Sequence, residues 1–101
     1  PRFTSHRDGD RVSSGFTLVG QTRPNATVQI EVVSSVSLLD VVNLGGQTLV
    51  DQDVTANSAG EFRITVPAPQ LPVPGTSYRI RATATSGTET SPQTEITLRQ
   101  R

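Results

Sequence analysis

The chain lacks cysteine, methionine, tryptophan and lysine. Without cysteine it forms neither a disulfide nor a thiolate metal site. Without lysine, all nine of its cationic side chains are arginines, which excludes a lysine nucleophile, a Schiff base and a lysine–asparagine isopeptide cross-link. Because no methionine is present, we expect the chain to be a segment of a larger protein in which residues 1–101 form a single domain.

The chain also has no excess of positively or negatively charged side chains. Nine basic side chains balance nine acidic ones, so the formal net charge is zero and the sequence pI is about 7.2. Nucleic acids and anionic membranes favour proteins with a basic face. No stretch approaches the roughly 20 apolar residues that a membrane helix needs. We therefore expect no nucleic-acid partner and no direct membrane insertion.

Apolar side chains are few but regularly spaced. Hydrophobic residues make up 33% of the chain and aromatic residues 4%, so a core must be built mainly from valine, isoleucine, leucine and alanine. These residues recur at every second position, which is the period of a β-strand. The period predicts strands at residues 2–4, 16–21, 27–33, 47–56, 61–66, 77–85 and 94–99.

Each predicted strand has one apolar face, and the chain offers no helix to cover it. A second sheet must then supply the cover, so we predict an all-β fold, a two-sheet antiparallel sandwich of about seven strands. Residues 6–15 and 67–75, rich in turn formers and proline respectively, are predicted loops. The side chains that we expect to anchor the core are Val28, Ile30, Phe62, Tyr78 and Ile80.

Residues 34–44 are apolar but break the alternation. The segment ends at Gly45-Gly46, which predicts a hairpin turn there. Its side chains Val36, Leu38 and Leu39 extend the core if they face inward, and form an interaction surface for a partner if they face outward. We favour the inward arrangement, because the core otherwise has few large residues.

Four pieces of the chain resemble the bacterial immunoglobulin-like domain family. They are G-F-T-L-V-G at 15–20, P-N-A-T-V-Q-I at 24–30, V-T-A-N-S-A-G-E-F at 54–62 and P-G-T-S-Y-R-I-R-A-T-A at 74–84, in the order typical of the family. The resemblance implies an immunoglobulin-like sandwich without catalytic residues. It also implies a spacer, adhesin segment or accessory domain that is extracellular, on the cell surface or periplasmic, with neighbouring domains of the same chain as partners.

Three residues have predicted structural roles within this pattern. Tyr78, near the start of the penultimate strand, fits a tyrosine corner, in which the hydroxyl bonds back to the nearby backbone. Gly20 lies on the Phe16 face of its strand and leaves room for another chain to approach closely. Gly60 belongs to a turn that spans residues 57–60.

Outward-facing arginines are the first candidate for binding. Arg79 and Arg81 share the outer face of one predicted strand, and with Arg63 on a neighbouring strand they would form a cationic patch for a carboxylate or a sulfated glycan. We favour the alternative, cross-strand ion pairing, which keeps the surface soluble and contributes little to stability. The acidic partners for this pairing are Glu31, Glu61 and Glu95.

Asp8-Gly9-Asp10 is the most metal-like motif. Two carboxylates separated by glycine can fold around Ca²⁺, with Asp51 and Asp53 as further ligands if they come close. Aspartate and glycine are also ordinary turn formers, so we expect no metal.

His6 is the only histidine. No G-x-S-x-G elbow and no glycine-rich phosphate loop accompany it, so we expect a surface histidine, no enzyme activity and no cofactor. A small hydrolase built on His6 is the least favoured hypothesis, and its test is whether a serine or an aspartate lies within hydrogen-bond reach.

Two non-catalytic functions are consistent with these patterns. The preferred one is a structural or spacer module of a bacterial surface or exported protein, with the two ends of the chain at opposite ends of the domain. The alternative is an adhesion module that binds a glycan or a protein through the Arg79/Arg81 face or through residues 36–44.

Overall fold

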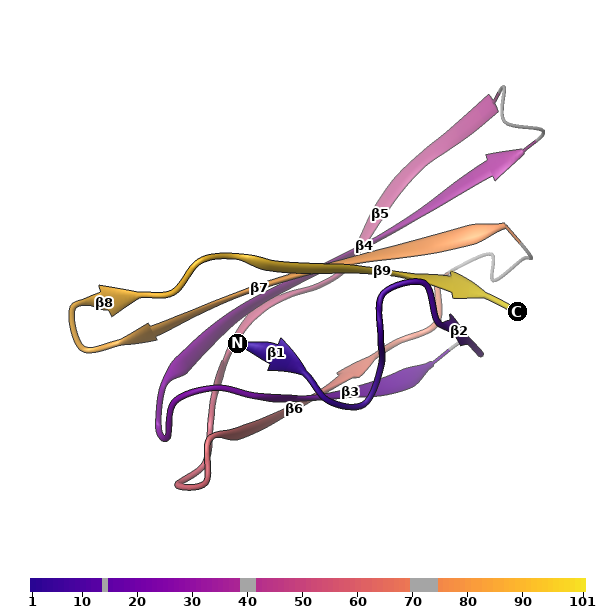
Figure 1. Ribbon diagram of the computed structural model, residues 1–101. Helices are drawn as coiled ribbons and strands as arrows, with labels where there is room; N and C mark the ends of the chain where they lie inside the picture. The colour runs from indigo at the N-terminus through magenta and orange to yellow at the C-terminus, as the bar shows by residue number, and fades with distance from the viewer. Residues whose placement is uncertain (14, 39–41, 70–74) are drawn as a thin grey trace.

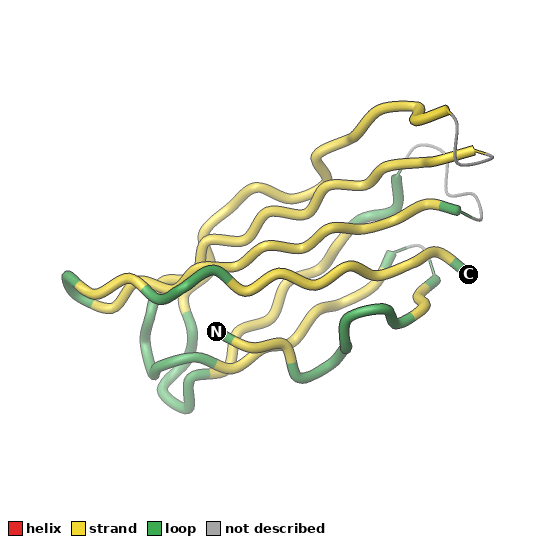
Figure 2. Tube along the Cα trace, turned by 45° about the horizontal axis from the view of Figure 1, so that its top comes forward, coloured by secondary structure: helices red, strands yellow, loops and turns green. Residues whose placement is uncertain are grey.

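Two β-sheets pack against each other through their apolar faces in the computed structural model (Figures 1 and 2). The structure describes residues 1–13, 15–38, 42–69 and 75–101. These residues form strands and turns, so the predictions of an all-β fold and of two sheets packed together are confirmed, whereas the predicted purely antiparallel pairing of about seven strands is not: nine strands are described, and one pairing is parallel. None of them forms a helix that is long and apolar enough to span a membrane. The molecule is elongated, with extents of 44 × 21 × 20 Å.

The smaller sheet has the strand order β1-β3-β6. Strand β1 spans Arg2–Phe3, β3 spans Phe16–Gln21 and β6 spans Glu61–Val66. Both pairings are antiparallel, and β3 pairs with β6 along its whole length. The bounds of β3 and β6 are those predicted from the alternation of apolar and polar residues.

The larger sheet has the order β2-β9-β7-β4-β5, and β8 pairs with β7 outside this path (Figure 1). Strand β2 pairs with β9 in parallel, and the other pairings are antiparallel. Three described strands, β1, β2 and β8, have only two residues each. The bounds in this sheet are Arg11–Val12 for β2, Thr27–Leu38 for β4, Val42–Thr55 for β5, Thr76–Ser86 for β7, Glu89–Thr90 for β8 and Thr94–Gln100 for β9.

Strand β2 lies inside residues 6–15, which we predicted as a loop. It pairs with Arg99 and Gln100 at the end of β9. Just before it, the Gly9 N–H donates to the Thr97 carbonyl at 2.8 Å, which ties the segment to the edge of β9. A strand of two residues has no alternation to reveal it, so only the return of the chain to this edge decides the pairing.

The hairpin turn predicted at Gly45-Gly46 is wrong. Strand β4 continues to Leu38 and β5 begins at Val42, so both glycines lie within β5. Gly46 pairs with Ser35 inside the hairpin. The glycine pair therefore belongs to the ladder between β4 and β5 and does not mark its turn.

Register shifts explain why residues 34–44 do not alternate. The pairing of β4 with β5 shifts between Val32 and Val33 and again between Ser35 and Ser37. Each irregularity sets an unequal number of residues on the two strands, which interrupts the period of two. The irregular spacing of apolar residues in this hairpin therefore follows from its β-bulges.

The predicted core anchors are buried between the two sheets. Val28, Ile30, Phe62, Tyr78 and Ile80 are each at most 2% exposed. Burying a side chain of this size stabilises the fold by roughly 1.5–3 kcal/mol. Both sheets contribute side chains to this core, and each sheet shields the apolar face of the other from water.

Gly20 admits an aromatic ring from the neighbouring strand. It pairs with Phe62 across β3 and β6, and a Cβ atom built on Gly20 would lie 2.2 Å from Cζ of Phe62. The Phe62 ring also packs edge-on with Phe3, and the two ring centroids lie 6.1 Å apart. The predicted close approach at Gly20 is therefore made by a side chain.

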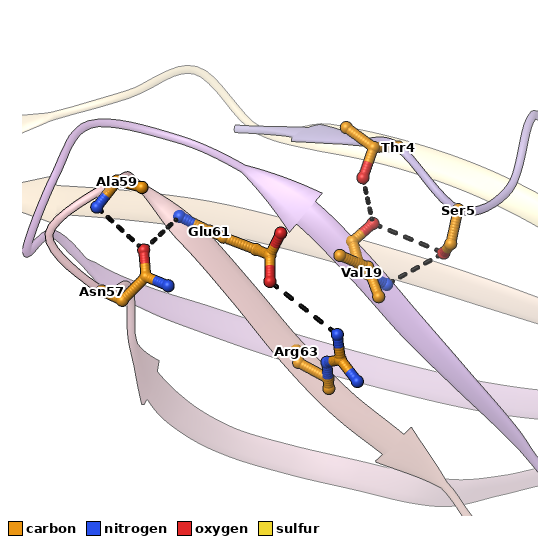
Figure 3. A network of polar contacts seen from close by, with 7 residues as sticks. All are labelled: Thr4, Ser5, Val19, Asn57, Ala59, Glu61 and Arg63. Carbon is orange, nitrogen blue, oxygen red and sulfur yellow. Dashed lines mark hydrogen bonds and ion pairs between the residues drawn. The ribbon is translucent and has the colours of Figure 1, made fainter.

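Gly60 closes the turn between β5 and β6. Its φ of +83° favours glycine, and a Cβ atom there would lie 2.2 Å from the carbonyl oxygen of Thr22. The side-chain oxygen of Asn57 accepts hydrogen bonds from the backbone N–H groups of Ala59 and Glu61, at 3.0 and 2.9 Å (Figure 3). The predicted turn at residues 57–60 is confirmed.

Substitution of Gly20→Ala tests the packing of Phe62 on β3. We expect it to lower the free energy of unfolding by about 1–3 kcal/mol in urea denaturation, because the new methyl group overlaps the ring. Gly46→Ala is the matched control within a strand. A Cβ atom there would lie 3.2 Å from a methyl carbon of Val33, so only a small adjustment is needed and the change should be much smaller. Equal stability of Gly20→Ala and the wild type would contradict the packing.

Candidate functional site

The outer face of the larger sheet carries most of the candidate binding residues. Strand β7 alternates as predicted, with Tyr78 and Ile80 in the core and Arg79 and Arg81 on the outer face. Strands β4 and β9 flank β7 along most of its length. The surroundings of each arginine are therefore set by the register of these three strands.

Arg81 forms ion pairs with glutamates on the strands on either side of it. Its guanidinium lies 2.9 Å from the carboxylate of Glu95 on β9 and 3.8 Å from that of Glu31 on β4. Asp51 on β5 pairs with Glu31, so the row contains three carboxylates and one guanidinium. The predicted cross-strand pairing is confirmed here, and Arg81 is not a free site for an anionic ligand.

The prediction that Arg63 joins Arg79 and Arg81 in one patch is wrong. Arg63 lies on β6 in the smaller sheet, whereas the other two lie on β7 in the larger sheet. The inner faces of the two sheets meet at the core, so their outer faces point in opposite directions. Arg63 instead lies 3.8 Å from Glu61 on its own strand (Figure 3).

Arg79 has different neighbours from Arg81. It pairs with Thr97 on β9, and Arg99, two residues further along, pairs with Ser77 on β7. Strand β2 then sets Arg11 beside Arg99 in the parallel pairing. The three arginines are all exposed and project from adjacent strands on one face of the sheet. We refer to Arg11, Arg79 and Arg99 as the arginine cluster.

No ion pair involves the arginine cluster within the described part of the chain. By contrast, Arg23, Arg63 and Arg81 each lie within 2.6–3.8 Å of a glutamate carboxylate. The three arginines of the cluster therefore keep guanidinium groups without a described carboxylate partner, although the net charge of the chain is zero.

Asp8 and Asp10 hold the β2 segment in place. The Asp8 carboxylate accepts a hydrogen bond from the Thr97 N–H at 2.7 Å, and the Asp10 carboxylate accepts one from the Arg7 N–H at 2.9 Å. The Asp10 carbonyl accepts a further bond from the Arg99 N–H at 2.9 Å. These aspartates are therefore structural residues at the edge of β9.

A calcium site that joins these aspartates to Asp51 and Asp53 is ruled out by the strand order. Asp51 and Asp53 lie on β5, which forms the opposite edge of the sheet from β2. Three strands separate the two pairs of carboxylates. Across residues 1–13, 15–38, 42–69 and 75–101, no group of three or more acidic or histidine side chains is arranged to hold a metal ion.

His6 is partly buried and has a serine partner. Its Nδ1 atom lies 2.7 Å from Oγ of Ser5, and its ring centroid lies 5.6 Å from that of Phe16. The Ser5 hydroxyl also accepts the Val19 N–H at 2.9 Å and lies 3.4 Å from the Val19 carbonyl (Figure 3). The serine that our test required is present, but its oxygen is occupied in tying the N-terminal segment to β3.

Tyr78 is fully buried, as expected of a core anchor. Its hydroxyl donates to the Gln100 side-chain oxygen at 2.6 Å, and its ring packs edge-on against Phe16 with centroids 5.3 Å apart. This hydrogen bond runs to a side chain on β9. The tyrosine corner, which requires a bond to the nearby backbone, stays a prediction.

The apolar hairpin is only partly described. Val36 pairs with the buried residue Thr76 on β7 and is itself half-buried. The side chain of Leu38 and the whole of Leu39 lie outside the described residues. The inward arrangement predicted for this segment is therefore supported at Val36 alone.

An open cavity of about 610 Å³ lies at the other end of the sandwich, between the β3–β4 turn and the β7–β8 hairpin. Arg23 and Glu89 line it and form an ion pair at 2.6 Å, with side chains that are 68% and 70% exposed. Because Arg23 is already paired, the cavity offers less free positive charge than the arginine cluster.

Sequence reasoning identified Arg79 but missed its two partners. Alternation within the predicted strand 94–99 places Arg99 on the outer face with Thr97, so that position was available from the pattern. Arg11 had no such signal, because it lies in the two-residue strand β2. No protein-family model and no curated protein matches the chain.

Substitution of Asp8→Ala tests whether this carboxylate anchors the β2 segment. We expect a decrease of about 1 kcal/mol in the free energy of unfolding, measured by urea denaturation, because the Thr97 N–H loses its acceptor. Asp51→Ala is the matched control, since Asp51 is exposed and pairs with the like-charged Glu31. It should change stability by no more than about 0.5 kcal/mol. An equal effect of the two substitutions would show that Asp8 has no anchoring role.

Proposed function

We propose that the chain is a non-catalytic immunoglobulin-like module that spaces or presents neighbouring domains in an exported or cell-surface protein. The strand order supports the immunoglobulin-like assignment. If β3, β4, β6, β7 and β9 are equated with strands B, C, E, F and G, then B and E share one sheet and G, F and C follow one another in the other. An immunoglobulin-like sandwich has this order of strands, and the agreement supports the assignment.

The sequence pieces that resemble the bacterial family fit this assignment. Residues 54–62 contain the end of β5, the turn at Gly60 and the start of β6. Residues 76–84 lie on β7, in the place of strand F. The resemblance and the topology are independent observations, because one rests on residue types and the other on strand pairing.

The placement of the two chain ends carries the spacer proposal. The Thr94 hydroxyl, at the start of β9, donates to the Pro1 carbonyl, whereas the Arg101 N–H, beyond the end of β9, donates to the Val12 carbonyl. The first and last residues are thus separated by the length of β9, roughly 23 Å at the rise of an extended strand. This is about half of the 44 Å long axis, and the β7–β8 hairpin extends beyond the N-terminus, so the ends are set apart but do not lie at the two ends of the domain as predicted (Figure 1). A chain that enters at one end of a strand and leaves at the other sets its neighbours apart.

The environment of Ser5 and His6 supports the non-catalytic assignment. The Ser5 oxygen accepts a backbone N–H from Val19, which holds it against β3. The described partners of the His6 ring are Ser5 and Phe16, neither of which supplies a carboxylate to orient it. The pair thus serves to fasten the N-terminal segment to the smaller sheet.

Exchange of the domain within the parent protein tests the proposal. We would replace residues 1–101 with an unrelated β-sandwich of similar length, and in a second variant delete them. The spacing role predicts that the exchange preserves access of antibodies and proteases to the flanking domains, whereas the deletion reduces it. The matched comparison is thermal unfolding of the flanking domains in each variant, which should not change. An exchange that impairs access as much as the deletion does would overturn the proposal.

A further inference from the structure

We propose that the arginine cluster is a binding site for an acidic polysaccharide that carries carboxylate or sulfate groups along its chain. A spacer needs no ligand, so this inference goes beyond the proposed function. It rests on the geometry of Arg11, Arg79 and Arg99, on their lack of described acidic partners and on the side chains between them.

The three arginines converge from different parts of the chain onto adjacent strands. Arg11 and Arg99 are paired residues on neighbouring strands, so their backbones lie about 5 Å apart. Arg79 is diagonal to Arg99 across β7 and β9, at roughly 7–8 Å. The cluster therefore spans about two strand spacings, or roughly 10 Å, across a single sheet face.

The charge of the cluster is available to a ligand. All three residues are exposed, and their guanidinium groups have no ion pair within the described ranges of the chain. Two carboxylates flank the cluster: that of Asp8 accepts the Thr97 N–H on β9, and that of Asp10 accepts the Arg7 N–H in its own segment. Neither carboxylate forms an ion pair with an arginine of the cluster in the described chain, so the three guanidinium groups keep hydrogen-bond donors for a ligand.

Arginine is suited to the anionic groups of such a polymer. Its planar guanidinium donates two parallel hydrogen bonds to a carboxylate or a sulfate, and it is more weakly hydrated than an ammonium group. Three guanidinium groups on one flat face can contact successive acidic groups of an extended chain. A single arginine could contact only one acidic group of the polymer at a time.

The side chains between the arginines favour a polysaccharide over other polyanions. Ser77 and Thr97 lie on the same face and pair directly with Arg99 and Arg79, so hydroxyl groups alternate with guanidinium groups across β7 and β9. Hydroxyl side chains both donate to and accept from sugar hydroxyls. The outer positions of these two strands, within the described chain, carry no aromatic side chain, which single-stranded nucleic acids use for stacking and protein interfaces use as anchors.

Binding to immobilised polysaccharides tests the proposal. The probes are heparin, which carries sulfate, polygalacturonate, which carries carboxylate, and neutral dextran. We expect the wild-type chain to bind heparin or polygalacturonate, or both, with an affinity that falls as salt is raised, and not to bind dextran. The heparin and polygalacturonate arms then distinguish which anionic group is preferred.

The test variant carries Arg11→Gln, Arg79→Gln and Arg99→Gln. We expect its affinity for the acidic polysaccharide to fall at least about tenfold, which corresponds to about 1.4 kcal/mol. All three side chains are exposed, and thermal unfolding of the variant checks that its fold is intact. If the triple variant does not fold, Arg79→Gln alone is measured and should still weaken binding.

The matched control carries Arg2→Gln, Arg23→Gln and Arg63→Gln. It loses the same number of charges from outside the cluster, on the smaller sheet and on the β3–β4 turn. We expect it to retain most of the wild-type affinity. A third variant with lysine at the three cluster positions keeps the charge but lacks the bidentate fork, and should bind with intermediate affinity.

Several results would overturn the proposal. They are no binding of the wild type to either acidic polysaccharide, equal losses in the cluster variant and the control, and tighter binding of a DNA duplex than of the polysaccharides at equal salt. None of these results bears on the spacer role, because the accessibility of flanking domains is measured without a polysaccharide.

Discussion

Strand β4 pairs with β5 on one side and with β7 on the other, and this double backbone ladder organises the larger sheet. Because successive side chains of a strand point to opposite faces, the ladder sends Val28 and Ile30 into the core and leaves Glu31 outside beside Arg81. The apolar side so created is too large to leave in water, and the smaller sheet covers it with Phe62 and its neighbours. Arg79 and Arg81 lie on the opposite, outer face of the same sheet.

The same ladder separates two arginines that look equivalent in the sequence. Arg79 and Arg81 are two residues apart on one strand, yet the register sets Arg81 between two glutamates and sets Arg79 opposite Thr97. One row holds three carboxylates and one guanidinium, whereas the arginines of the cluster have no described carboxylate partner, so charges are separated on the surface of a chain whose net charge is zero. An average over the composition cannot reveal such a surface, since electrostatic recognition depends on where charges lie within a screening length of about 10 Å.

The proposed spacer role and the proposed polysaccharide site are compatible within one module. The ends of the chain lie at the two ends of β9, whereas the arginine cluster lies on the outer face of β2, β9 and β7, next to the final residues. A module placed between neighbours could hold them apart through its rigid sandwich and contact an acidic polymer through this face. The first role depends on the core and the second on three exposed side chains, so the two can be altered separately.

The sequence by itself determined the strand periods, the inward anchors such as Ile30 and Tyr78, and the two-sheet architecture, because alternation is a local property of neighbouring residues. It also favoured cross-strand pairing of the outward arginines with Glu31, Glu61 or Glu95, without assigning a partner to each arginine. Only the tertiary structure decided that Arg63 belongs to the other sheet and that Arg11 and Arg99 join Arg79. It also showed that Gly45-Gly46 lies within β5 and not in the hairpin turn. These outcomes depend on which strands become neighbours, and strand pairing joins residues far apart in the chain that no local pattern connects.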